Sequence, residues 1–115
     1  MIARILTFVA ITCCATSAFA HAFLQHAEPG AGATFKMAPS RVVLSFSEKL
    51  QPVLSGVSVT NLAGRNVAAG AVAIRGNSML VPLSSLAAGT YRVVWHVVSA
   101  DTHRMEGAYS FAVKP

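Results

Sequence analysis

The chain has 115 residues, a formal net charge of +5 at pH 7 and only 11% charged residues. A chain of this length fits one domain. Its basic residues are spread singly, which excludes the basic patch or stripe that nucleic-acid-binding and membrane-surface proteins present. We therefore expect no nucleic-acid partner.

The first twenty residues have the three parts of a secretory signal peptide. Arg4 supplies positive charge, the run 5–12 is almost wholly apolar, and Ala18-Phe19-Ala20 gives the small-x-small pattern of a cleavage site. The apolar run is too short to span a bilayer. We expect residues 1–20 to be removed and the exported domain to comprise residues 21–115, without a membrane span.

Three other interpretations of this segment stay open: a retained membrane anchor, a buried helix and a lipoprotein signal. The residues before Cys13 and Cys14 fit poorly with the small residue that lipidation requires before its cysteine. Cleavage after Ala20 would remove both cysteines, so the mature domain would have neither a disulfide nor a thiolate metal ligand. It would keep eight basic and four acidic residues, a net charge of about +4.

Short apolar segments alternate with turn signals at roughly ten-residue spacing, which predicts an all-β sandwich or barrel. No window has the pattern of an amphipathic helix of ten or more residues. In chain order, we expect turns at 28–30 and 38–40, strands at 41–47 and 56–60, a loop at 61–70, a hairpin of 72–74 with 78–83, and strands at 90–98 and 107–113.

The strand at 90–98 is the strongest, because it is rich in β-branched and aromatic residues. Tyr91 opens this strand after a glycine turn, as in the tyrosine corner of immunoglobulin-like sandwiches. Alternation along the strands places these side chains on common faces: Val42, Leu44 and Phe46; Val57 and Val59; Tyr91, Val93, Trp95 and Val97; Tyr109, Phe111 and Val113.

Two features of the sequence suggest a metal site. His21 would be the first mature residue, and its free α-amine and Nδ1 could close a chelate ring that exists only after cleavage. Asp101 and His103 are two residues apart after the 90–98 strand, so on an extended chain they would point the same way. The second pattern is a weak signal by itself, because a surface aspartate and histidine also explain it. The first has an alternative too, because many signal peptides are cut before a residue that has no role.

Several motifs occur in a fixed order along the mature chain. They are His21-Ala22-Phe23-Leu24, Glu28-Pro29-Gly30-Ala31-Gly32-Ala33, Leu44-Ser45-Phe46-Ser47-Glu48, and the run from Tyr91 to His103 followed by Gly107 and Tyr109-Ser110-Phe111. With this combination the chain resembles the CopC/PcoC family of periplasmic copper-binding proteins. The resemblance implies a small Greek-key, immunoglobulin-like β-sandwich or barrel of about seven strands. It also implies a periplasmic carrier, buffer or donor of copper that is not an enzyme.

The resemblance further implies the ligands of one Cu(II) ion per chain. By matching positions these are the amine and imidazole of His21, with Asp101 and His103, and Glu48 is a further candidate contributor. Three nitrogens and one carboxylate oxygen suit tetragonal Cu(II). The family also implies an inner-membrane copper transporter as a partner, and we expect the chain to be a monomer.

Some family members carry a methionine-rich loop for Cu(I), but the corresponding residues 60–67 contain no Met or His. We therefore expect no Cu(I) site. The mature methionines Met37, Met79 and Met105 are dispersed and are expected to pack against apolar neighbours. The remaining histidines, His26 and His96, are expected to have surface or hydrogen-bonding roles.

Two functions of other classes remain open at this point. One is a metal-free immunoglobulin-like interaction module. The other is a copper-dependent oxidase, because lytic polysaccharide monooxygenases also use an N-terminal histidine chelate. The small size of the chain and the carboxylate of Asp101, which would fill a position that oxygen chemistry needs open, argue against the oxidase.

Overall fold

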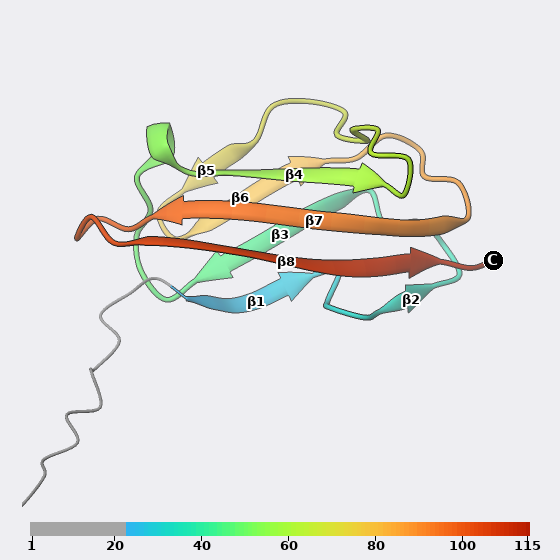
Figure 1. Cartoon of the computed structure of the whole chain (residues 1–115), viewed down its shortest axis with the longest axis horizontal. Coiled ribbons are helices and arrows are strands. Elements are labelled where there is room, and N and C mark those ends of the chain that lie inside the picture. Colours follow the sequence, from blue (N-terminus) through green and yellow to red (C-terminus); the bar gives the residue numbers. More distant parts are fainter. Residues whose placement is uncertain (1–22) are drawn as a thin grey trace, which may run out of the picture.

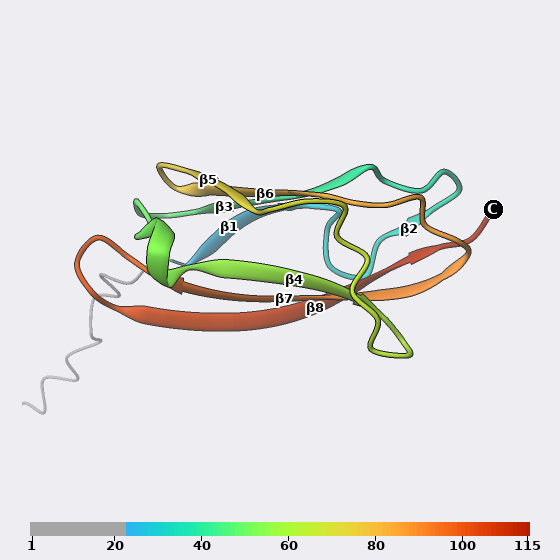
Figure 2. The ribbon, with the colours of Figure 1, turned by 90° about the horizontal axis from the view of Figure 1, so that it is seen from above.

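Residues with alternating apolar and polar side chains form two sheets that face each other and bury their apolar sides between them (Figures 1 and 2). This computed structural model describes residues 23–115, so the expected signal peptide and His21 lie outside the described residues. The described elements are β1 (Leu24–Glu28), β2 (Thr34–Phe35), β3 (Arg41–Phe46), the 3-10 helix η1 (Pro52–Leu54), β4 (Gly56–Asn61), β5 (Ala73–Arg75), β6 (Ser78–Pro82), β7 (Gly89–Val98) and β8 (Arg104–Val113).

The first sheet has the order β1-β3-β6-β5 and the second the order β2-β8-β7-β4. All pairs are antiparallel except the two-residue β2, which runs parallel to β8. The chain passes from one sheet to the other between β1 and β2, β2 and β3, β3 and β4, β4 and β5, and β6 and β7. Figure 2 shows the two layers edge-on. The predicted sandwich is confirmed, with eight strands in the described part of the chain.

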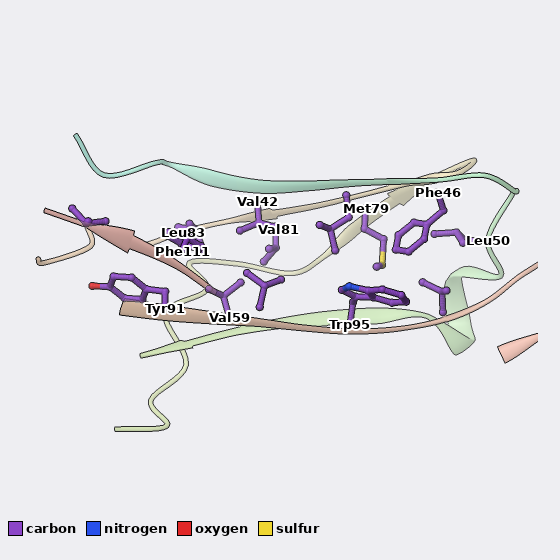
Figure 3. Packing of buried hydrophobic residues seen from close by; sticks show 14 residues of the cluster. Val42, Phe46, Leu50, Val59, Met79, Val81, Leu83, Tyr91, Trp95 and Phe111 are labelled. Atoms are coloured by element: carbon purple, nitrogen blue, oxygen red, sulfur yellow. The ribbon is translucent and has the colours of Figure 1, made fainter. Parts of the chain in front are cut away.

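The core lies between the sheets and contains the side chains that the alternation placed on common faces. Val42, Leu44, Phe46, Val59 and Val93 are fully buried. Figure 3 shows Phe46 and Met79 of one layer facing Trp95 of the other. The rings of Phe46 and Trp95 meet edge to face with their centroids 5.2 Å apart, an arrangement that aromatic pairs favour.

The expected tyrosine corner is present. The hydroxyl of Tyr91 donates a 2.7 Å hydrogen bond to the carbonyl of Ala87, four residues upstream. The ring of Tyr91 stacks on Phe111 with centroids 5.5 Å apart. This contact anchors the start of β7, the strand whose other end leads into the candidate site.

Three segments far apart in the sequence meet at one end of the sandwich. The β7–β8 hairpin loop, the connection between β3 and η1, and the start of β1 lie together at the left of Figure 1, opposite the C-terminus. No helix within residues 23–115 has the length and apolar character needed to cross a membrane.

Candidate metal centre

The β7–β8 loop is a tight turn that closes on itself through backbone hydrogen bonds. The N–H of Ser99 donates to the carbonyl of His103, and the N–H of Thr102 donates to the carbonyl of Ser99, each over 2.9 Å. Thr102 has a φ of 72°, in the left-handed region that β-branched residues rarely adopt. The turn therefore holds its two potential ligands, Asp101 and His103, on either side of a strained residue.

Asp101 and His103 are brought together as the sequence predicted. Nδ1 of His103 lies 2.9 Å from Oδ2 of Asp101, and both side chains are partly exposed. The prediction assumed an extended chain, whereas the structure achieves the contact through a turn. A neutral imidazole can donate from Nδ1 to this carboxylate, and a metal ion held by both residues would displace the proton between them.

The Asp101 carboxylate is held at both oxygens. The hydroxyl of Ser99 donates to its Oδ1, and His103 contacts its Oδ2. The hydrogen bonds from Ser99 and then from His103 lower the pKa of Asp101 from 3.8 to about 2, since both favour the charged form. The carboxylate is thus ionised and oriented at any pH near neutrality. Sequence reasoning missed Ser99, which carries no motif signal of its own.

The chain segment that follows His21 is fixed to the F-S-E motif. The N–H of Phe23 donates to Oγ of Ser47, and the N–H of Ser47 donates to the carbonyl of Phe23, each over 2.9 Å. His21 is two residues before Phe23, a reach of at most about 7 Å along an extended chain. These two bonds anchor the first described residue, Phe23, next to the end of β3.

The same connection after β3 also contacts the β7–β8 loop. The N–H of Ala100 donates to the carbonyl of Lys49 over 2.8 Å. The side-chain amide of Gln51 donates to the carbonyl of Ser99 over 2.9 Å. Residues 47–51 therefore make hydrogen bonds to two places. Ser47 bonds to Phe23, just before β1, and Lys49 and Gln51 bond to the β7–β8 loop.

Glu48 lies in this segment and is half-buried. Among residues 23–115, no three His, Cys, Asp or Glu side chains come close enough together to hold a metal ion. Glu48 therefore does not form such a group with Asp101 and His103. The described residues bring together two of the predicted ligands, Asp101 and His103, while the third, His21, lies outside the described residues.

The other candidate residues have mixed outcomes. His26 is exposed with Nε2 3.2 Å from Oε1 of Glu28, and His96 is exposed on the outer face of β7. Both surface predictions are confirmed. Met79 is fully buried, and Met105 packs at the edge of the core, as expected. The packing prediction is wrong for Met37, which is 85% exposed because it lies in the irregular connection between β2 and β3.

Comparison with known proteins places the chain in one family. The CopC domain family matches residues 24–114. Copper resistance protein C of Xanthomonas campestris pv. juglandis is 41% identical, over 98% of this chain and 95% of that protein. The crystal structure of CopC from Methylosinus trichosporium OB3b superposes with a TM-score of 0.76 at 31% identity, covering 83% of this chain and 95% of the other.

A second solved structure is that of PcoC from Escherichia coli, described as a methionine-rich copper resistance protein. It is 38% identical with a TM-score of 0.69, over 83% of this chain and all of the other. The match of sequence and fold extends across β1 to β8, and it includes the loop that carries Asp101 and His103. This chain belongs to the CopC family.

Proposed function

We propose that the mature protein binds one Cu(II) ion and acts as a periplasmic carrier, buffer or donor in copper resistance or homeostasis. The ion is held by the α-amine and imidazole of His21, by Asp101 and by His103. The observation that carries this proposal is the preformed Asp101–His103 pair, 2.9 Å apart on a loop connected by hydrogen bonds to the segment that anchors Phe23.

The donor set supports Cu(II) on chemical grounds. Two imidazoles, one amine and one carboxylate suit a tetragonal cupric ion, which also leads the divalent metals in affinity for nitrogen ligands. The ionised Asp101 would offset part of the metal charge without first losing a proton. Glu48 is retained in the proposal as an outer contributor, because it lies between the two anchoring residues Ser47 and Lys49.

We propose that the chain lacks the methionine site for Cu(I). Within the described residues Met79 is in the core, Met105 is on β8 and Met37 is in the β2–β3 connection, three separate places in the fold. A Cu(I) site needs soft sulfur ligands grouped together. The expected result is that a Cu(I) chelator of moderate affinity keeps its metal in the presence of this protein.

Members of the CopC family are copper-binding proteins and the chain is not an enzyme, so the oxidase alternative no longer applies. The metal-free interaction module remains the competing function for this chain. Family membership favours copper because the matched region contains the Asp101–His103 pair.

A Cu(II) titration followed by electron paramagnetic resonance tests the proposal. The mature protein beginning at His21 should give an axial, nitrogen-rich spectrum that saturates at one equivalent. His103→Ala should weaken binding strongly, and the matched variant His26→Ala should not. Weak binding that His103→Ala leaves unchanged would refute the proposal.

The role of the amine has its own test. A protein with one extra residue before His21 keeps every side chain but loses the chelate, so it should bind Cu(II) much more weakly. Equal affinity would remove the amine from the ligand set. Intact mass of the exported, copper-loaded protein would establish the cleavage point and the stoichiometry together.

Delivery to an inner-membrane copper transporter, by a monomeric carrier, is also part of the proposal. The partial exposure of Asp101 and His103 at one end of the sandwich supports it, because a partner can reach the metal there without unfolding the domain. Light scattering at working concentration should give the mass of one chain, and a stable dimer would contradict this part.

A further inference from the structure

The hydroxyl of Ser99 is a polar group in the interior of the domain. Ser99 is fully buried, and it is the only buried polar residue within residues 23–115. A buried hydroxyl without a partner destabilises the fold. The partner here is the carboxylate of Asp101, with the carbonyl of His103 at 3.4 Å as a weaker second contact.

The surroundings of Ser99 allow it little freedom. Its carbonyl accepts hydrogen bonds from the N–H of Thr102 and from the side-chain amide of Gln51, each over 2.9 Å. Its N–H donates to His103 over 2.9 Å, and the adjacent Leu50–Ser99 bridge joins it to the segment after β3. The hydroxyl therefore projects from a fixed backbone towards the loop.

This arrangement forms a chain of three side chains, from Ser99 through Asp101 to His103. Ser99 holds Oδ1, which leaves Oδ2 directed at Nδ1 of His103. A carboxylate oriented in this way selects the imidazole tautomer with its proton on Nδ1 and keeps the two proposed ligands in contact.

We propose that Ser99 is a positioning residue for the copper site, which orients Asp101 and, through it, sets the tautomer and orientation of His103. The proposal rests on the proposed function. It adds to the proposed ligands a buried residue, Ser99, that belongs to no motif predicted to bind metal. Ser99 itself does not touch the metal.

The test compares Ser99→Ala with the matched control Ser55→Ala in the mature protein. Ser55 also uses its hydroxyl on the nearby backbone, accepting from the N–H of Val98 over 3.0 Å, but has no contact with Asp101 or His103. Ser99→Ala should lower Cu(II) affinity by about tenfold or more, the usual effect of losing an outer-shell partner. It should also change the electron paramagnetic resonance parameters, whereas Ser55→Ala should change neither.

A double-mutant cycle separates positioning from a general loosening of the loop. If Ser99 acts through the carboxylate, Ser99→Ala should have little further effect on affinity in an Asp101→Ala background. The same loss in both backgrounds would overturn the proposal, and so would wild-type affinity and spectrum in Ser99→Ala alone.

A measurement on the metal-free protein keeps the inference distinct from the proposed function. In the neutral form of His103, nitrogen NMR should show the proton on Nδ1. Ser99→Ala should raise the share of the Nε2-protonated tautomer, and an unchanged ratio would count against positioning. If the wild type bound no copper, the proposed function would fail, while this measurement would still decide whether Ser99 orients the pair.

Discussion

Ser47 and Phe23 exchange two hydrogen bonds, in which the Ser47 hydroxyl accepts from the Phe23 N–H and the Ser47 N–H donates to the Phe23 carbonyl. Both are 2.9 Å long. They fix the chain just beyond His21 to the end of β3. The neighbouring Lys49 carbonyl accepts from Ala100 in the β7–β8 loop, so one short segment contacts both Phe23 and the loop that carries Asp101 and His103.

The first prediction concerns the Ser47 hydroxyl. Ser47→Ala removes one of the two bonds to Phe23 and should lower Cu(II) affinity several-fold, because the N-terminal chelate becomes less restricted. The matched control is Ser45→Ala, two residues earlier on β3, whose hydroxyl faces Ser78 at 3.4 Å. Isothermal titration of both variants checks this, and equal affinities would show that Ser47 does not restrict the chelate.

The second prediction concerns the backbone of Thr102, whose φ is 72°. A left-handed conformation costs a residue with a β-carbon about 1–2 kcal/mol. Glycine avoids this cost, but its greater freedom in the unfolded chain offsets part of the gain. Thr102→Gly should therefore raise the free energy of unfolding of the metal-free protein, by up to about 1 kcal/mol. It should also weaken copper binding, because the loop becomes less rigid.

Chemical denaturation and copper titration of Thr102→Gly measure the two effects. Thr60→Gly in β4 is the control, since a glycine in an ordinary strand should only destabilise. A loss of stability in Thr102→Gly as large as in Thr60→Gly would contradict the assignment of strain.

The third prediction follows from the lowered pKa of Asp101. The carboxyl has a pKa of about 2 in the folded protein against a reference of 3.8. The folded state therefore favours the ionised form, and this contribution is complete above pH 3.8 and is lost as the pH falls through about 2. The free energy of unfolding of the metal-free protein should fall in that window.

Asp101→Asn should reduce this acid dependence, and Glu106→Gln, which changes an exposed carboxyl on β8, should reduce it less. The measurement is the denaturant midpoint of each variant at a series of pH values between about pH 5 and pH 2. Carboxyl groups change their charge within this range. Identical pH profiles for Asp101→Asn and the wild type would show that Ser99 and His103 do not stabilise the ionised carboxylate.

The fourth prediction tests the packing of Trp95 on β7 against Gly107 on β8. A Cβ atom added at Gly107 would lie 2.4 Å from Cζ2 of Trp95, too close for any real contact. Gly107→Ala should therefore destabilise the fold by about 1–3 kcal/mol, the usual cost of overpacking. Gly30→Ala is the control, because its nearest neighbour would be a carbonyl at 3.8 Å.

The fluorescence of Trp95, the single tryptophan, reports both the unfolding transition and any displacement of the indole in Gly107→Ala. Equal unfolding midpoints for Gly107→Ala and Gly30→Ala would contradict the prediction, because they would mean that the sheet can accommodate a methyl group next to Trp95.

Most of the fold was predictable because a two-residue period is visible wherever one face of a strand is buried. The strands β3, β4 and β6 to β8 have this pattern, and their inward residues form the core. β1 was not predicted, because its only partly buried residues, Leu24 and Ala27, are three apart on an edge strand. β2 was not predicted either, because its two residues are too few to show a period.

The candidate site was predictable only in part. The spacing of Asp101 and His103 indicated their convergence, and the structure confirms it. The contacts that support them could not be seen, because Lys49 and Gln51 reach the loop from about fifty residues away in sequence. Such contacts depend on how the two sheets stack, which a single sequence does not encode in any local pattern.

The connections that meet at this end come from different sheets. Phe23 precedes β1 of the first sheet, whereas Ala100 follows β7 of the second. The proposed metal ion, shared by His21 and the β7–β8 loop, would link the two layers, and residues 23–115 contain no cysteine that could do so. Separation of the layers would then require loss of the ion, and bound ligand adds its binding free energy to the stability of the folded state. In the proposed periplasmic location, the lifetime of the protein among proteases would then rise and fall with the copper supply.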